Sequence, residues 1–341
     1  MKPLLKWTGG KSSELPIIKK HLPKKFDNFV EPFIGGGAVY FSIEHKQNIV
    51  NDFNKELISF YNLLKQTNFN QFEKIIKKII NERKRINNLK VDNSFNDNCK
   101  KIKNNKTYHK YLTREVNSKA KIIKKINEEL IKNKKSGINK EESEEHKRTA
   151  AQAALYYTYR ELYNQQNKKM AYDQKHLAYW FIMRELGYGG MFRFSKEGNF
   201  NVPYGGLSYN KKDLEVKLKE IKNLNKKSFY LNTEFNNLDF EKFFEKYDYF
   251  TKNDFIFLDP PYDSEFSQYN KEEDFTRNDQ IRLKNSLLKT KAKILLIIKN
   301  TEFIHNLYKD DFKIKNFNKN YSVNFKNRNN QEVNHLIITN Y

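Results

Sequence analysis

The sequence predicts an α/β protein in which an alternating α/β domain is interrupted by a helical region that carries a β-hairpin. Short apolar segments alternate with helical patterns in residues 3–61 and again in residues 228–341. The middle of the chain is instead rich in Lys, Asn and Glu, with helical periodicity. A length of 341 residues fits two domains, or one domain with a large insertion.

The first motif is Gly9-Gly10-Lys11-Ser12, which has the ending of a phosphate-binding P-loop. A P-loop also requires a glycine at position 5, where this chain has leucine, and a preceding strand, which is missing. We therefore interpret this segment as a turn near the N-terminus.

A strand at about residues 29–32 leads into Gly35-Gly36-Gly37, and a helix begins at residue 38. Glycines let the backbone approach a ligand closely, and a helix N-terminus favours polar or anionic groups. A second short strand then ends in Asn51-Asp52. In Rossmann-like units an acid about 20 residues after the first strand binds ribose hydroxyls. This order predicts a nucleoside cofactor; a helix-capping role for Asp52 is the alternative.

The next part of the chain is expected to be helical over residues 57–80, with its apolar residues facing a core. Residues 86–150 form a Lys/Asn-rich insertion, with one amphipathic helix around residues 122–131 and a loop at 136–145. The lysines of this insertion could follow DNA phosphates, although a solvated lysine face is the simpler interpretation.

A helix over residues 176–186 is expected to end at Gly187. Residues 188–205 then alternate on both sides of Lys196-Glu197-Gly198, which predicts a β-hairpin. A basic, aromatic hairpin can read a DNA groove, and an ordinary structural hairpin is the alternative.

The second α/β segment contains expected strands at residues 229–231, 255–258, 293–298, 312–317 and 333–339, and a helix at 278–289. Asp259-Pro260-Pro261-Tyr262 follows the buried strand 255–258, at the strand end where open α/β sheets bind ligands. Asp259 and the Pro260 carbonyl can accept hydrogen bonds from a planar amine, and Tyr262 offers a flat face to its ring. A strand end with a rigid turn is the alternative.

The net charge of +23 favours a polyanionic partner, first of all nucleic acid, with a membrane surface as the alternative. No apolar run approaches the ~18–20 residues that span a bilayer, and we identify no signal peptide. The single cysteine, Cys99, excludes a disulfide framework and a Cys-based zinc site, and fits a reducing cytoplasm.

These blocks, in this order, resemble the alpha-class DNA adenine-N6 methyltransferases of the Dam type. The similarity covers most of the chain outside residues 86–150. The matching segments are 6–11, 29–37, 51–52, 187–190, 201–205, 259–262 and the tail 328–341.

The resemblance implies a class I S-adenosylmethionine-dependent methyltransferase fold, which is Rossmann-like with a mostly parallel seven-stranded sheet. The catalytic domain would comprise residues 1–65 and 226–341, and residues 66–225 would be an inserted helical and β-hairpin target-recognition region. The implied cofactor is S-adenosylmethionine and the implied substrate is a flipped-out adenine in double-stranded DNA. A restriction endonuclease for the same site is an optional partner, and the implied location is the cytoplasm of a bacterial or phage-infected cell, at the nucleoid.

The resemblance also assigns residues to roles. The catalytic set is Asp259, Pro260, Pro261 and Tyr262. The cofactor set is Trp7, Gly10, Lys11, Glu31, Phe33, Gly35, Asp52, Glu234, Phe235 and Asp259. The DNA-contacting set is Lys11, Tyr188, Arg193, Lys196, Glu197, Asn201, Pro203 and Tyr204.

Two positions depart from the family pattern. Glu234 stands where relatives often have Asp, and Glu197 stands just before the turn glycine, where relatives that read GATC usually carry a basic residue, commonly Arg. Arg and Lys suit guanine, whereas Glu accepts from cytosine N4, so GATC specificity is doubtful unless Lys196 substitutes. Cytosine N4, RNA adenine and a protein glutamine amide are alternative targets, and a catalytically silent DNA-binding protein is the alternative from another class.

Overall fold

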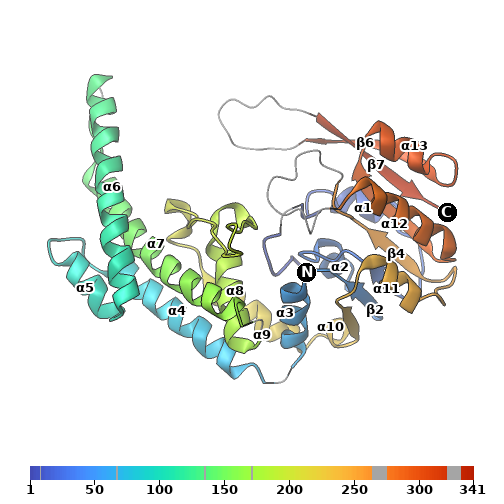
Figure 1. Cartoon of the computed structure of the whole chain (residues 1–341), viewed down its shortest axis with the longest axis horizontal. Helices are drawn as coiled ribbons and strands as arrows, with labels where there is room; N and C mark the ends of the chain where they lie inside the picture. The colour runs from blue at the N-terminus through green and yellow to red at the C-terminus, as the bar shows by residue number, and fades with distance from the viewer. Residues whose placement is uncertain (8, 67, 134–135, 170–171, 263–274, 321–331) are drawn as a thin grey trace. The chain divides into compact units, whose positions relative to one another are not determined.

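The computed structural model describes residues 1–7, 9–66, 68–133, 136–169, 172–262, 275–320 and 332–341. The chain forms two compact units (Figure 1). The first unit comprises Met1–Pro3, Gly9–Lys65 and Leu224–Tyr341, and the second comprises Leu4–Thr8 and Gln66–Asn223. We call them the sheet unit and the helical unit. Part of the tail similarity, up to residue 331, lies outside the described residues.

The sheet unit is built on a seven-stranded sheet with the order β3-β2-β1-β4-β5-β7-β6. Strands β1 to β5 pair in parallel, and β7 runs antiparallel to both of its neighbours. The strands are β1 (Phe29–Glu31), β2 (Asn48–Asn51), β3 (Thr233–Asn236), β4 (Phe255–Leu258), β5 (Lys293–Lys299), β6 (Lys313–Asn320) and β7 (Glu332–Thr339). The mostly parallel seven-stranded sheet that the family resemblance implies is confirmed.

The central strand β4 is buried along its whole length, because helices cover parallel sheets on both faces. On one face, alternate residues such as Ile256 and Leu258 belong to an apolar core shared with α11, α12 and α13. Beside β3, rings from α2, α3 and α10 meet Phe235, which stacks on Tyr61. The helices of this unit are α1 (Leu15–Lys20), α2 (Ala38–Ile43), α3 (Lys55–Lys65), α10 (Ser228–Leu231), α11 (Phe240–Lys246), α12 (Arg277–Lys289) and α13 (Glu302–Tyr308).

The helical unit contains α4 (Asn70–Asn88), α5 (Phe95–Ile102), α6 (Lys106–Lys132), α7 (Lys140–Asn167), α8 (Gln174–Leu186), η1 (Tyr188–Gly190), η2 (Leu207–Tyr209) and α9 (Leu214–Leu224). The long helices α6 and α7 run beside each other (Figure 1). In the part of the chain that the structure describes, no helix combines the length and apolar character needed to cross a membrane.

Three element predictions were wrong. Residues 141–145 are not a loop but the start of α7, where Asn139 and Glu142 form a capping box, and acidic side chains favour a helix N-terminus. The strand expected at 229–231 is the short helix α10, and β3 begins two residues later at Thr233. The single helix expected over 57–80 is divided into α3 and α4.

Candidate active site

The carboxyl ends of β1, β2 and β3 are tied together by one amide. Asn51, at the end of β2, donates to the Pro32 carbonyl at 3.1 Å and to the Leu238 carbonyl at 3.0 Å. Its Oδ1 accepts from the Leu238 backbone N–H at 2.9 Å. Asn51 is buried, so these bonds are shielded from water. They fix the edge of the sheet at which the predicted ligand-binding residues stand.

The Asp-Pro-Pro-Tyr segment continues directly from β4 and is held by Lys11. The Lys11 ammonium lies 2.6 Å from Asp259 Oδ1 and 3.0 Å from the Tyr262 hydroxyl. Only 3% of the Lys11 side chain is exposed, compared with 19% for Asp259. One buried cation therefore sets the carboxylate and the aromatic ring side by side. The structure thus brings together three residues that the sequence analysis placed in one site.

Two further side chains support this segment, and the sequence analysis missed both. Gln280 of α12 is buried and donates from Nε2 to the Pro261 carbonyl at 3.1 Å. His335 of β7 is buried and places Nε2 3.2 Å from the Tyr262 hydroxyl. For His335 the available signal was its place directly before the apolar residues 336–338, because a buried polar side chain usually forms a hydrogen bond. Gln280 stands in a largely polar helix, which gave no such signal.

The glycine turn after β1 faces the end of β2. Gly35 has a φ of +47° and donates its N–H to Asp52 Oδ2 at 2.8 Å. The other Asp52 oxygen accepts from the Asn54 N–H at 2.9 Å. Tyr61 donates its hydroxyl to the Gly35 carbonyl at 3.0 Å. The helix cap of α3 is Asn54, whose Oδ1 accepts from the Leu57 N–H at 2.9 Å. The capping alternative for Asp52 is therefore wrong, and Asp52 instead anchors the glycine turn 17 residues upstream.

Several carboxylates lie at this edge of the sheet, and burial there raises the pKa values of two of them. Burial, followed by the negative charges of Asp259 and Asp52, raises the pKa of Glu31 well above its usual value, although the Tyr40 N–H donates to it at 3.0 Å. Burial also raises the pKa of Asp52 to about 6, against the lowering effect of its two backbone donors. Perturbed carboxylates in one place are typical of functional sites.

The remaining predicted cofactor residues of the sheet unit flank this edge. Phe33 packs on Phe240 and Phe275, with ring centroids 5.8 Å apart in both cases. Glu234 is about half exposed and forms an ion pair with Lys246 at 2.8 Å. Burial opposes its ionisation, but hydrogen bonds from Lys246 and Tyr247 outweigh this effect and lower the pKa of Glu234. Gly10 is exposed.

Trp7 belongs to the helical unit. Its ring lies 4.8 Å from that of Phe192, and the buried Arg184 guanidinium of α8 contacts both rings. Arg184 also donates to the Lys6 carbonyl at 2.8 Å and to the Met191 carbonyl at 3.1 Å. The short segment that contains Lys6 and Trp7 is therefore clamped to the start of the predicted hairpin.

The hairpin exists but is loosely paired. Its bridges are Phe194 with Phe200 and Gly187 with Tyr204, and the turn is closed by the Gly198 N–H donating to the Ser195 carbonyl at 2.9 Å. On its surface, Arg193 donates to Asn201 Oδ1 at 2.7 Å. The exposed predicted DNA contacts are Tyr188, Arg193, Lys196 and Glu197, whereas Asn201 and Pro203 are half-buried. Tyr204 is only 6% exposed and packs on Tyr156, so it is a core residue.

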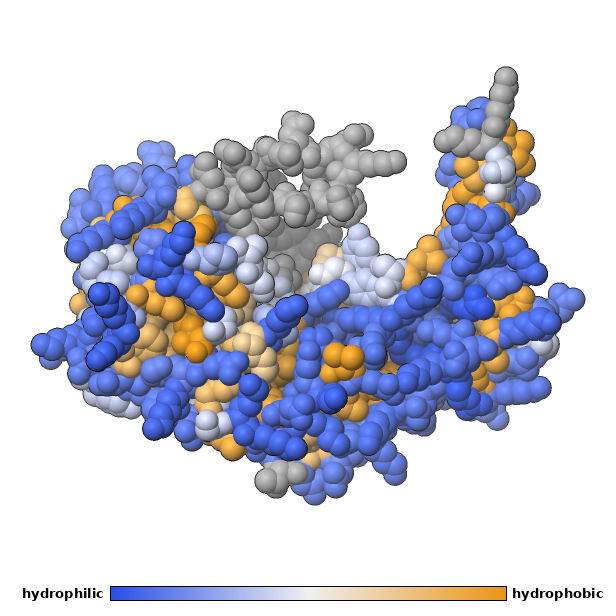
Figure 2. Space-filling model, turned by 180° about the vertical axis from the view of Figure 1, so that it is seen from behind, coloured by the Kyte–Doolittle hydropathy of each residue, from blue (hydrophilic) through white to orange (hydrophobic). Residues whose placement is uncertain are grey.

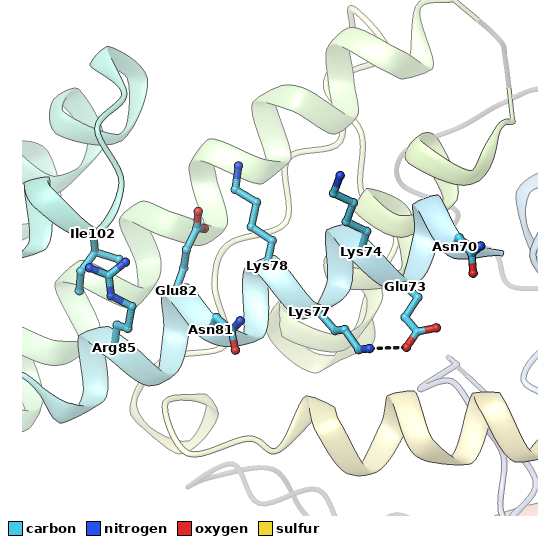
Figure 3. A pocket seen from close by; sticks show the side chains of 9 residues that line it. All are labelled: Asn70, Glu73, Lys74, Lys77, Lys78, Asn81, Glu82, Arg85 and Ile102. Atoms are coloured by element: carbon cyan, nitrogen blue, oxygen red, sulfur yellow. Dashed lines mark ion pairs between the residues drawn. The ribbon is translucent and has the colours of Figure 1, made fainter.

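A basic groove runs along α4 in the helical unit (Figure 3). Its volume is about 670 Å³, and lysines and Arg85 contribute much of its lining. Lys74 and Lys78 point to the same side of the helix, whereas Lys77 forms an ion pair with Glu73 at 2.6 Å (Figure 3). The face of the molecule drawn in Figure 2 is mostly hydrophilic, with apolar residues in scattered groups. In the described ranges, no cluster of His, Cys, Asp and Glu is arranged to hold a metal ion.

Comparison with known protein families assigns the chain to one of them. Residues 7–120 and 117–323 match the model of the D12 class N6 adenine-specific DNA methyltransferases. The chain belongs to this family. It is therefore an adenine-specific DNA methyltransferase, as its resemblance to the Dam type implied, and it transfers a methyl group to DNA.

Relatives of this methyltransferase span its whole length. It is 26% identical to the Type II methyltransferase M.CviBI of Paramecium bursaria Chlorella virus NC1A, with 100% of both chains covered. It is 28% identical to the Type II methyltransferase M.MjaIII of Methanocaldococcus jannaschii, with 100% of this chain and 99% of that protein covered. It is also 48% identical to the DNA adenine methylase of Escherichia coli K12 over 61 residues, which are 18% of this chain and 22% of that protein.

Proposed function

We propose that this methyltransferase takes its methyl group from S-adenosylmethionine, bound at the carboxyl ends of β1, β2 and β3. The chemistry of the site fits such a ligand, which carries an ammonium, a sulfonium and ribose hydroxyls. Glu31 and Asp52 supply carboxylates at the ends of β1 and β2, and Asp259 supplies one at the end of the neighbouring strand β4. The Gly35 turn lets the backbone approach closely. When bound, the cofactor supplies an electrophilic methyl group.

Each cofactor-binding residue then has a task. We assign the ribose hydroxyls to Asp52, because an ionised carboxylate accepts two hydrogen bonds. Glu31, Phe33 and Gly35 lie under the methionine end, and Glu234 and Phe235 flank the adenine. We also assign Trp7, Gly10 and Lys11 to the cofactor-binding set, as the family resemblance implies.

The proposed target is an adenine that is flipped out of double-stranded DNA, which costs a few kcal/mol. Tyr262 stacks on the base and offsets part of this cost, by roughly 1–3 kcal/mol. Asp259 and the Pro260 carbonyl accept the two N–H bonds of the amino group. This orients the nitrogen lone pair out of the ring conjugation, so the residues act by positioning and electrostatics. Pro261 fixes the backbone between them.

We assign target recognition to residues 66–225. Within them, the exposed hairpin residues that would contact a groove of the DNA are Tyr188, Arg193, Lys196 and Glu197, with Asn201 and Pro203 beside them. The DNA partner follows from the family, and the net charge of +23 supports binding to its phosphates. We further propose a role in restriction and modification, with an endonuclease for the same site, or a Dam-like role, in the cytoplasm. The relatives named Type II methyltransferase and DNA adenine methylase correspond to these two roles.

The Lys11 bridge between Asp259 and Tyr262 is the observation that carries this proposal. Its test is Asp259→Ala, expressed in a methylation-deficient host whose DNA is then read by single-molecule sequencing. Wild-type protein should mark adenines within one short motif, and the variant should mark none while it still binds DNA. Wild-type methylation by Asp259→Ala would refute the assigned role. The far-UV circular dichroism spectrum and the thermal unfolding midpoint of the variant provide the control for folding.

A further inference from the structure

The Tyr262 hydroxyl has partners on two sides. Lys11 Nζ lies 3.0 Å away, and His335 Nε2 lies 3.2 Å away. The rings of Tyr262 and His335 meet edge to face, with centroids 5.7 Å apart and planes at 62°. His335 also packs on Phe317 of β6, with ring centroids 5.5 Å apart. His335 is thus fixed in the sheet, with 0% of its surface exposed.

The chemistry of the two neighbours decides which group donates in each hydrogen bond to the Tyr262 hydroxyl. An ammonium group can only donate, so the Tyr262 oxygen accepts from Lys11. The phenolic proton is then available to an acceptor, and Nε2 of a neutral imidazole is one. His335 stands in β7 directly before the apolar residues Leu336, Ile337 and Ile338. A buried imidazole without a hydrogen bond would destabilise this strand, so the contact to Tyr262 stabilises both residues.

We propose that His335 is a positioning residue that fixes the ring of Tyr262 in the orientation in which it stacks on the extrahelical target adenine. This inference rests on the proposed function of Tyr262. A free tyrosine ring rotates about two side-chain torsions and loses that freedom when a base stacks on it. Hydrogen bonds on both sides of the hydroxyl orient the ring before the base arrives, so less entropy is lost on binding. His335 itself touches neither base nor cofactor in this scheme.

Two substitutions of His335 separate a positioning role from simple burial. A glutamine side chain carries its amide at the reach of Nε2, whereas asparagine carries it one bond shorter, at the reach of Nδ1. His335→Gln should therefore retain most of the single-turnover methylation rate. His335→Asn should lower it about five- to tenfold, which is the effect of losing one hydrogen bond of this kind. The KM for S-adenosylmethionine should be unchanged, because the lost hydrogen bond orients the ring that stacks on the target adenine and does not contact the cofactor.

The decisive measurement is a double-mutant cycle with Tyr262→Phe, which keeps the ring and removes the hydroxyl. If His335 acts through that hydroxyl, His335→Asn should have no further effect in the Tyr262→Phe background. A 2-aminopurine placed at the target adenine, in the site found by sequencing, reports base flipping in the same variants. Its fluorescence on binding should fall in His335→Asn and recover in His335→Gln.

Several outcomes would overturn the inference. Multiplicative losses in the cycle would show that His335 acts independently of the Tyr262 hydroxyl, and equal losses in the Gln and Asn variants would indicate a purely structural role. If His335→Asn does not fold, the other two variants decide, since the proposal requires a near wild-type rate for His335→Gln and a reduced rate for Tyr262→Phe. Asp259→Ala is carried in parallel. Methylation by that variant would remove the proposed function, whereas its absence together with a multiplicative cycle would remove the role of His335 alone.

Discussion

The Lys11 ammonium is paired with the Asp259 carboxylate at 2.6 Å, with most of both side chains withdrawn from water. The pair joins the N-terminal turn to the end of β4. Charges in such surroundings depend on each other, because removing one partner leaves the other poorly solvated.

Lys11→Met should destabilise the protein by about 2 kcal/mol, below the ~3–5 kcal/mol of a fully buried pair because Asp259 keeps some exposure. Asp259→Asn in the Lys11→Met background should recover part of that loss, since position 259 then carries no charge. The recovery is partial because the buried Glu14 carboxylate, 4.0 Å from Lys11 Nζ, also loses its ion pair with Lys11. Urea unfolding of the four proteins in the cycle measures both terms. Independent, additive losses would contradict the coupling. Lys11→Arg serves as the control that keeps the charge.

Cofactor binding should weaken as the pH falls through about 6, the raised pKa of Asp52. Ribose hydroxyls donate to the ionised carboxylate, so binding requires loss of its proton and should approach a tenfold change per pH unit below that value. For the free protein the sign is opposite. A raised pKa contributes stability below the unfolded value of about 3.9, and this contribution is lost as the pH rises through about 6.

Calorimetric titration with S-adenosylhomocysteine between pH 5 and 8 measures this linkage. Asp52→Asn should bind more weakly at pH 8 and show a flatter pH dependence. Glu31→Gln is the matched control, because burial and neighbouring charges also raise the pKa of Glu31. An unchanged pH dependence in Asp52→Asn would exclude Asp52 as the linked group.

Arg184→Met should destabilise the helical unit by about 2–4 kcal/mol. It leaves the Lys6 and Met191 carbonyls without their guanidinium donors and removes the cation from the rings of Trp7 and Phe192. The chain has two tryptophans, so Trp180→Phe leaves Trp7 as a single reporter. Its emission should shift to longer wavelength when Arg184 is also replaced. Arg184→Lys keeps the charge but not the planar fork and should give an intermediate result. An unshifted spectrum would contradict the clamp.

Glu197→Arg should change the sequence preference of the enzyme. Glu197 is exposed at the hairpin turn, next to Lys196, and carboxylate and guanidinium groups prefer different base edges. Sequencing of DNA methylated by the variant and by Glu197→Gln compares the sites directly, and a change worth about 1–3 kcal/mol at one base pair is expected. An identical motif in all three proteins would remove Glu197 from base readout.

Lys74 and Lys78 of α4 provide a test of the basic groove. If they contact phosphates, changing both to Gln should reduce the slope of log Kd against log salt concentration by about 2. The reduction should be the same for DNA that contains the target site and for DNA that lacks it. Lys77→Gln is the matched control, because its ammonium already pairs with Glu73. If the slope of the double variant stays at the wild-type value, the groove is a solvated lysine face.

The sequence predicted the local parts of this site better than their assembly. Asp259 and Tyr262 could be placed because an apolar strand and a breaker are read within a few neighbouring residues. The contact of Lys11 with Tyr262 spans 251 residues and depends on the order of strands, which local patterns do not contain. His335 and Gln280 were missed for the same reason, since each acts on a segment from a different element.

The errors in secondary structure also have local causes. The aromatic residues of 229–231 favour a strand by propensity, but packing of Phe229 on Tyr40 and Tyr230 on Phe235 suits one turn of helix before β3. The acidic residues at the start of α7 were assigned to a loop because a run of charged residues is common both in solvated loops and in the first turn of a helix. Capping residues are polar in both situations, so composition alone does not separate them.

The division of the chain between its two units has a consequence for protein engineering. Because Leu4–Thr8 folds with Gln66–Asn223, while the residues on both sides of that short segment fold with the sheet, the helical unit is encoded in two separate stretches. A chimera that exchanges only residues 66–223 with a relative would pair a foreign hairpin with the native Trp7 and its neighbours. Transplanting sequence preference between these enzymes therefore calls for a graft with two inserts, in which the N-terminal pentapeptide travels with the larger piece.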